Sequence, residues 1–135
     1  MIKVDIDNRT GMVIDVKKIE NYVKQIIHYL FPKKNSHFLE IIFVDDQEIA
    51  KLNKKHLKRN GATDIISFPN ANLEIDGPRS LGSLVIAPHY LKSNNEQYEE
   101  VILHGIIHLF GLDHEVEPII WSNKINEVKN GIFAV

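Results

Sequence analysis

The chain has 135 residues, of which 44% are hydrophobic and 25% are charged, and this composition is typical of one folded domain rather than a disordered segment. Its 16 basic and 18 acidic residues give a formal net charge of −2, so a site for a polyanion must be a local cluster of cations. The absence of cysteine excludes disulfides, thiol catalysis and cysteine-ligated zinc or iron–sulfur sites.

The amino-terminal half of the chain predicts alternating strands and helices. Residues 2–6 alternate apolar and charged side chains, which is typical of a half-buried strand and unlike the apolar core of a signal peptide. Asp15 can cap a helix whose apolar period of 3.6 residues continues to Pro32. The nearly continuous apolar run over 38–44 predicts an interior strand, and Asp45 then opens a second helix as part of a capping box.

The carboxy-terminal half predicts two more strands and two more helices. The strands and the polar loop between them are expected over residues 63–68, 81–87 and 70–80. Ser93 with Glu96 has the spacing of a capping box, so a helix is expected from about Asn94 to Phe110. Gly111 suits the left-handed position after that helix, and a last helix is expected from Pro118 to Gly131.

These elements follow one another without a repeat, a low-complexity tract or a linker, so a single domain over residues 1–135 is expected. Interspersed strands and helices favour an α/β or α+β class with a small sheet of about four strands. No apolar run approaches the ~20 residues of a membrane span. We therefore expect a small cytoplasmic protein with no membrane partner.

A histidine cluster in the last third of the chain predicts a metal site. His104 and His108 are four residues apart on a predicted helix, so both imidazoles project from one face. Gly111 lets the chain reverse, and His114 can then return as a third ligand. Imidazoles one turn apart suit a Zn²⁺ with nitrogens at ~2.0–2.1 Å, and three ligands leave a position open for water, as in catalytic sites. Ordinary helix histidines are the alternative, but two unpaired histidines on a largely apolar helix would be costly to bury.

The spacing matches that of the three-histidine zinc proteases, His-Glu-x-x-His-x-x-Gly-x-x-His. The glutamate that serves as general base in those enzymes is Gly105 in this chain, so the group that takes the proton from water is missing. The sequence therefore keeps the metal-binding scaffold and lacks the usual protease base. A peptidase that uses Glu115 as its base is an alternative.

The stretch His104-Gly-x-x-His108-Leu-x-Gly111-x-Asp113-His114 resembles the histidine motif of the YbeY family, bacterial metal-dependent endoribonucleases of ribosomal RNA maturation. Residues 62–69, Ala-Thr-Asp-Ile-Ile-Ser-Phe-Pro, are similar to the family's Pro-Thr-Asp-Val-Leu-Ser-Phe-Pro block and follow a Leu-Asn pair, as they do in the family. Residues 81–86 resemble its Leu-Gly-Asp-Val-x-Ile strand. The resemblance is good over residues 38–114 and poor after Glu117.

This resemblance implies a zincin-like α+β fold, with a small mixed sheet of about four strands packed with about five helices. It also implies a zinc ion on His104, His108 and His114. It also implies cleavage of single-stranded RNA in 3′-end maturation of small-subunit (16S) rRNA, and a part in ribosome quality control. The implied partners are rRNA of the small subunit and a ribosomal protein or ribosome-assembly GTPase, with no DNA. The alternatives are a metallohydrolase of another substrate, such as a peptide, and a non-catalytic zinc-containing ribosome-assembly factor.

The family's catalytic arginine falls on Leu57 when the sequences are compared without gaps. Arg59 lies two positions later, and we expect it to take over the arginine's role, with Lys58 as the fallback. The physical need is a cation near the metal, which stabilises negative charge on the phosphoryl oxygens. Asp113 is expected either to orient a liganding imidazole or to cap the chain reversal, and a proton-transfer group is the alternative.

A run of cations precedes this segment with the spacing of one helix face: Lys51, Lys54, Lys55, Lys58 and Arg59. Because the net charge of the chain is slightly negative, such a local concentration favours a track for the phosphate backbone of RNA. Lys54, Lys55 and Lys58 are the predicted substrate-binding residues. A solvated outer helix face is the alternative.

Overall fold

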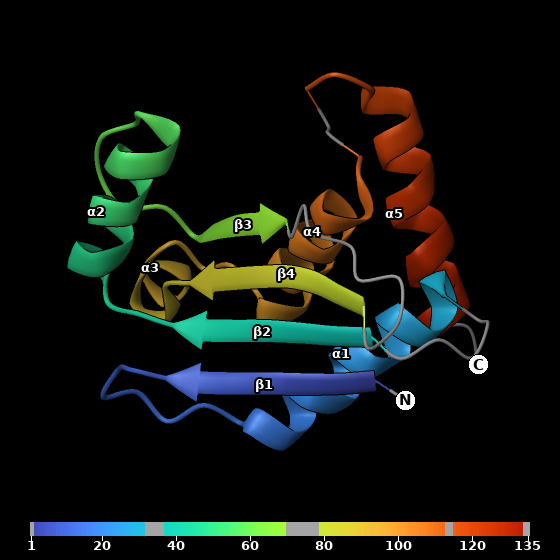
Figure 1. Ribbon diagram of the computed structural model, residues 1–135, viewed down its shortest axis with the longest axis horizontal. Coiled ribbons are helices and arrows are strands. Elements are labelled where there is room, and N and C mark those ends of the chain that lie inside the picture. The colour runs from blue at the N-terminus through green and yellow to red at the C-terminus, as the bar shows by residue number, and fades with distance from the viewer. Residues whose placement is uncertain (1, 32–36, 70–78, 113–114, 134–135) are drawn as a thin grey trace.

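The computed structural model describes residues 2–31, 37–69, 79–112 and 115–133, which form a mixed sheet with helices packed on it (Figure 1). In chain order the elements are β1 (Ile2–Asn8), α1 (Val16–Leu30), β2 (His37–Phe43), α2 (Asp46–Leu57), β3 (Ile65–Pro69), β4 (Arg79–Ile86), α3 (Pro88–Ser93), α4 (Tyr98–Phe110) and α5 (Pro118–Phe133). None of the helices in these ranges is long and apolar enough to span a membrane.

Within the described residues the sheet has four strands in the order β1-β2-β4-β3. The first three are parallel to one another and β3 runs antiparallel to β4, so the sheet is mixed, as predicted. Buried and half-buried residues alternate along β2, as expected for a strand with one face on the core. Ile41 of β2 pairs with Ile6 on one side and Leu84 on the other, and β2 is the predicted interior strand. The α+β fold class is confirmed.

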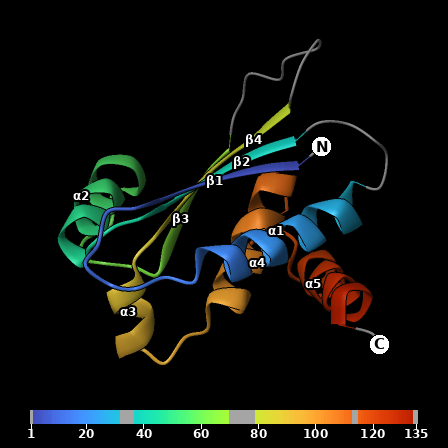
Figure 2. The same ribbon diagram turned by 90° about the horizontal axis from the view of Figure 1, so that it is seen from below.

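Helices α1, α4 and α5 lie on the same side of the sheet (Figure 2). The main core joins them to the strands through side chains that are almost fully excluded from solvent, among them Ile26, Ile41, Ile102, Ile106 and Val128. Each apolar side chain of this size contributes about 1.5–3 kcal/mol when it is buried. Helix α4 therefore lies at the centre of the molecule, packed against both the sheet and other helices.

Three of the predicted helix boundaries are confirmed by their hydrogen bonds. The Asp15 carboxylate accepts from the backbone N–H of Lys18 at 3.1 Å, and the Asp45 carboxylate accepts from that of Glu48 at 2.8 Å. Both are N-caps that satisfy donors in the first helical turn. Gly111 has φ 111° and donates its N–H to the carbonyl of His108 at 3.0 Å, so it ends α4 in the left-handed conformation.

The predicted helix start near Asn94 is wrong. Ser93 ends the short helix α3, which the sequence did not predict and which begins at Pro88. The chain then turns through Asn95, whose φ is 55°, and α4 begins only at Tyr98, after an N-cap Gln97 that makes no side-chain cap bond. The spacing of Ser93 and Glu96 therefore belongs to the end of one helix rather than to the start of the next.

Candidate functional site

Helix α4 presents two imidazoles to a common pocket. Its residues Leu103, Ile106 and Ile107 are buried in the core, whereas the His104 side chain is 46% exposed and His108 is half-buried. Both histidines line a cavity of about 670 Å³, which we call the histidine pocket. The predicted placement of the two rings on one helix face is therefore observed.

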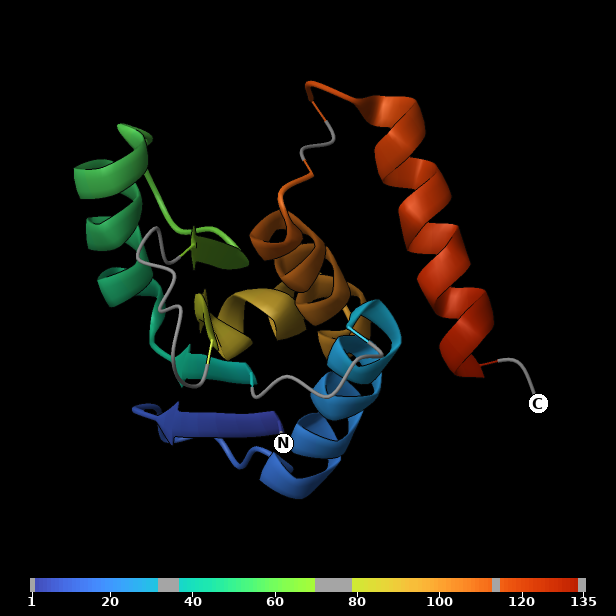
Figure 3. The same ribbon diagram turned by 45° about the vertical axis from the view of Figure 1, so that its right-hand side comes forward.

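Besides α4 itself, the histidine pocket is lined from two segments, within residues 57–69 and within residues 115–121. In the ribbon, α2 and α5 lie on opposite sides of α4 (Figure 3). The polar and aromatic side chains that the two segments contribute are Arg59, Thr63, Asp64, Ser67, Glu115 and Trp121. The pocket thus collects one guanidinium, two carboxylates and two imidazoles from parts of the chain that are far apart in the sequence.

Trp121, in the first turn of α5, packs against both imidazoles. Its ring centroid is 4.6 Å from that of His108 with the planes at 45°, and 5.7 Å from that of His104 with the planes at 72°. The sequence motifs assigned no role in the site to Trp121. No local pattern could have indicated the contact, because it depends on how α5 lies across α4.

A charged pair, Lys129 of α5 and Glu100 of α4, lies next to His104. Lys129 Nζ donates to Glu100 Oε1 at 2.6 Å, and the other oxygen of Glu100 lies 3.7 Å from His104 Nε2. Partial burial lowers the pKa of His104, with Lys129 and His108 acting in the same direction and Glu100 opposing them. The neutral ring is therefore favoured, and this is the form of histidine that binds a metal.

The donor chemistry of this face fits a zinc ion, because two imidazoles one helical turn apart open into one pocket. The predicted third ligand His114 and its neighbour Asp113 lie outside the described residues. Within the part of the chain that the structure describes, no three histidine, cysteine, aspartate or glutamate residues form a possible metal cluster. The zinc site on His104, His108 and His114 stays a prediction.

Arg59 lines the histidine pocket, but it is not on the helix that the sequence predicted for it. Helix α2 ends at Leu57, and Lys58 follows in the left-handed conformation with φ 58°. The buried Asn53 holds the next turn: its side-chain amide donates to the carbonyl of Gly61 at 3.1 Å, and its carbonyl accepts from the backbone N–H of Arg59 at 3.3 Å. The loop over 58–61 therefore carries Arg59 to the pocket.

Comparisons with known proteins bear on this site. The family model described as "Endoribonuclease YbeY" matches residues 5–133. The chain is 35% identical to the Endoribonuclease YbeY of Thermodesulfovibrio yellowstonii, with 85% of this chain and 86% of that protein covered. It is 34% identical to the Endoribonuclease YbeY of Nautilia profundicola, over 84% of this chain and 80% of the relative. The chain belongs to the YbeY family.

A solved structure has the same fold. The solution structure of TM1509 from Thermotoga maritima matches with a TM-score of 0.58 and 24% identity, over 98% of this chain and 89% of that one. This likeness concerns the fold alone, whereas the family model, which matches residues 5–133, also covers the segment after Glu117.

Gly105 separates this YbeY chain from a zinc protease in physical terms. The glycine is buried, and a Cβ added to it would lie 2.8 Å from Ile65 Cδ1 and 2.9 Å from Leu84 Cδ2. Helix α4 approaches β3 and β4 so closely that a glutamate at this position would have to displace both side chains. Glu115, the alternative base, does line the pocket.

The predicted cationic stripe is shorter than expected. Helix α2 exposes Lys51, Lys54 and Lys55, but it ends at Leu57, before Lys58 and Arg59. The prediction of one helical stripe of five cations is therefore wrong. The Lys58 ammonium turns back to donate to the carbonyl of Lys55 at 3.4 Å. None of the lysines is among the residues found to line the histidine pocket, and RNA binding by Lys54, Lys55 and Lys58 stays a prediction.

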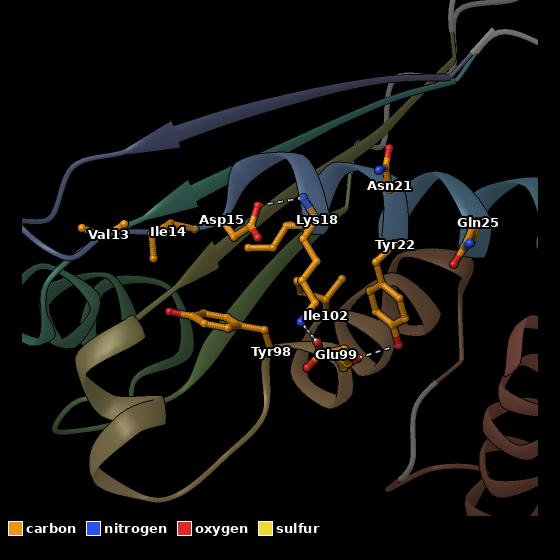
Figure 4. Close-up of a pocket in the computed structure, with 11 residues that line it drawn as sticks. Val13, Ile14, Asp15, Lys18, Asn21, Tyr22, Gln25, Tyr98, Glu99 and Ile102 are labelled. Atoms are coloured by element: carbon orange, nitrogen blue, oxygen red, sulfur yellow. Dashed lines mark hydrogen bonds and ion pairs between the residues drawn. The ribbon is translucent and has the colours of Figure 1, made fainter.

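A second cavity, of about 570 Å³, lies beside α1 and α4, and we call it the α1 pocket (Figure 4). Its lining is mostly apolar, and none of its described lining residues is a histidine. The Tyr22 hydroxyl donates to the carbonyl of Glu99 at 2.9 Å, and Lys18 Nζ lies 3.7 Å from the carboxylate of Glu99. Burial, together with the charges of Glu100 and Glu99, raises the pKa of Tyr22 to about 12.

Proposed function

We propose that this YbeY-family chain is a zinc-dependent endoribonuclease that cleaves single-stranded RNA in 3′-end maturation of small-subunit (16S) rRNA. The observation that carries the proposal is the histidine pocket, which is lined by His104, His108 and Arg59 together. The names of the relatives support RNA as the substrate. A role in ribosome quality control, with a ribosomal protein or a ribosome-assembly GTPase as partner, is proposed on the family resemblance.

His104 and His108 would hold the zinc ion, with His114 as the third ligand. When bound, the ion supplies a Lewis acid for the phosphodiester and lowers the pKa of a water molecule towards neutrality. The protein's own contribution is to keep both imidazoles on one face of a buried helix and to favour the neutral form of His104. Because α4 is fixed by its core contacts, the two nitrogens need little reorganisation to bind.

Arg59 would bind the phosphate that is cleaved. Its guanidinium makes no hydrogen bond to another side chain or carbonyl within the described residues, so its donors can be directed at a ligand. Two parallel N–H groups match two phosphate oxygens, whereas the apolar Leu57 offers no donor. As negative charge builds on those oxygens, the fixed cation stabilises the transition state more than the ground state.

Proton transfer has two candidate carboxylates in the pocket, Asp64 and Glu115. The Asp64 carboxylate already accepts from the backbone N–H of Ile65 at 2.7 Å and from the Thr63 hydroxyl at 3.3 Å. These bonds hold the Asp64 carboxylate against the start of β3, which indicates a structural role. We assign proton transfer, from either a water molecule or the substrate 2′-hydroxyl, to Glu115, because it lines the pocket together with both imidazoles and Arg59.

The position of Glu115 also favours one second candidate, a peptidase. Zinc peptidases need a carboxylate base beside the metal, and Glu115 lines the pocket in which Gly105 provides none. The presence of Arg59 in the pocket favours the endoribonuclease over the peptidase. Hydrolysis of a neutral amide places no anionic phosphate there for the guanidinium to bind.

The test is the cleavage of a single-stranded RNA and of an unstructured peptide by zinc-loaded protein, with His108→Ala as the control. We expect cleavage of the RNA, no cleavage of the peptide, and loss of RNA cleavage in the variant. Peptide cleavage with intact RNA would establish the peptidase instead. Zinc bound at one ion per chain with neither substrate cleaved would favour a non-catalytic assembly factor.

A further inference from the structure

Trp121 occupies an unusual place in the histidine pocket. It belongs to α5, it is only 8% exposed, and it is the single tryptophan of the chain. Its indole contacts the rings of both His104 and His108, which stand on a different helix. One aromatic side chain from another element thus forms a wall against both imidazoles.

Such a wall restricts the torsions that a metal site depends on. The χ2 torsion of histidine is broad, so an imidazole on an exposed helix face samples many ring orientations. Two imidazoles can share one ion only when both rings turn their nitrogens towards the same point. The indole lies tilted against one ring and edge-on to the other, so neither ring can rotate without moving against the same side chain.

Helix α5 holds the indole in place and also carries Lys129, which acts on His104 through Glu100. Trp121 donates its backbone N–H to the carbonyl of Glu117 at 2.9 Å, and the following turns are anchored in the core by Ile125 and Val128. Lys129 holds Glu100, whose second oxygen lies 3.7 Å from His104 Nε2. Both contacts act on the histidine face from the same helix, through groups that do not themselves bind a metal.

We infer that Trp121 is a positioning residue that holds the His104 and His108 rings in the orientation in which they bind one divalent ion. The inference rests on the proposed zinc site and adds a residue to it that acts through the ligands. Groups that orient metal ligands in this way change metal affinity by on the order of 10–100-fold when they are removed.

The experiment is a calorimetric titration of metal-free protein with Zn²⁺ and with Co²⁺. Trp121→Phe keeps an aromatic ring beside the imidazoles, and Trp121→Leu keeps apolar volume without a ring. Ile19→Ala is the control for loss of buried apolar volume, because Ile19 is 6% exposed in the same core but belongs to α1 and lines the α1 pocket. We expect Trp121→Leu to weaken binding by about 10–100-fold, Trp121→Phe to restore most of the affinity, and Ile19→Ala to leave it unchanged.

A second measurement needs no metal. In the metal-free protein the indole ring current shifts the ring-proton resonances of His104 and His108, and we expect Trp121→Leu to remove that shift while Ile19→Ala keeps it. Leucine fills much of the space of the indole, so Trp121→Leu is expected to fold where Trp121→Ala would leave a cavity. Melting temperatures of all variants separate a change in affinity from a change in stability.

The outcomes separate the two proposals. Wild-type protein that binds neither metal would overturn the proposed zinc site itself. Wild-type protein that binds zinc, together with Trp121→Leu binding as tightly as Ile19→Ala, would overturn the positioning role of Trp121 and leave the zinc site standing. Unshifted histidine resonances in the metal-free wild type would also overturn that role.

Discussion

The two pockets beside α4 are close in size, about 670 and 570 Å³, yet only one of them has the groups for phosphodiester chemistry. The histidine pocket brings together side chains from α4, α5 and the loop after α2. In the α1 pocket, polar groups interact with one another. Tyr22 donates a hydrogen bond to the Glu99 carbonyl, and Lys18 lies within ion-pair distance of the Glu99 carboxylate. Cavity volume alone therefore does not identify a site; the chemistry of the side chains that converge on the cavity does.

The largest expected difference between the pockets is in metal binding. His108→Ala leaves His104 and His114 as ligands and removes the pair of nitrogens on one helical turn, so most of the bound zinc should be lost. Metal analysis after purification in zinc without chelator gives the measurement. Gln25→Ala, in the α1 pocket, is the matched control and should keep one ion per chain. Full metal content in His108→Ala would contradict the predicted ligand set.

Arg59→Ala tests the other essential part of the histidine pocket. Removal of one electrostatic interaction with the reacting group typically costs on the order of 10²–10³ in rate with little change in fold. We therefore expect RNA cleavage to fall by that factor while zinc content and melting temperature stay at wild-type values. Arg59→Lys should recover part of the rate, because it restores the charge without the two parallel donors. Wild-type cleavage by Arg59→Ala would transfer the role to Lys58 or show that the group is not needed.

The lysines on and just after α2 (the α2 lysines) are expected to differ from those of α1 in their contribution to RNA binding. If Lys54, Lys55 and Lys58 bind phosphates, replacing all three by Gln should weaken RNA binding and lower its log–log salt slope by about 0.7 for each phosphate that is no longer neutralised. Fluorescence anisotropy of a labelled RNA at several salt concentrations measures the slope. Replacement of Lys17, Lys18 and Lys24 on α1 by Gln is the control with the same change of charge, and it should leave the slope unchanged. Equal slopes in all three proteins would make the α2 lysines a solvated face.

The smallest effect is expected in the α1 pocket and concerns stability at high pH. The folded-state pKa of Tyr22 is about 12, above the value of about 10 for an unfolded tyrosine. The folded state therefore binds this proton more tightly, and the resulting stability is present below pH 10 and decreases as the pH rises towards 12. Urea denaturation across that range should show a weaker pH dependence in Tyr22→Phe than in wild type, with unchanged RNA cleavage at neutral pH. An identical pH dependence would mean that Tyr22 ionises as freely when folded as when unfolded.

Local pattern predicted much of this molecule, because caps, periodicity and ligand spacing act over a few residues. The Asp15 and Asp45 caps, the interior strand β2 and the shared face of His104 and His108 all follow from such short-range rules. The same rules predicted the wrong start for α4, since the Ser93–Glu96 spacing does not say on which side of the pair the helix lies.

Features that depend on how separate elements meet were not predictable. The departure of Lys58 and Arg59 from α2 requires a left-handed residue that is not glycine, and it is held by Asn53 through its hydrogen bonds with the following loop. Trp121 meets the imidazoles only because α5 crosses α4 at that point. Both features bring distant parts of the chain together, and apolar periodicity carries no information about such docking.

The central position of α4 sets the timescales on which the two halves of the site move. Amide hydrogens of a helix enclosed by the core exchange with deuterium only through unfolding of the whole domain, whereas those of an exposed turn exchange through local opening. The backbone of His104 and His108 should therefore be among the slowest segments to exchange, and residues 58–61 among the faster ones. A slowly exchanging helix thus carries the two imidazoles and a faster-exchanging loop carries Arg59, so the loop over 58–61 can open locally while α4 stays folded.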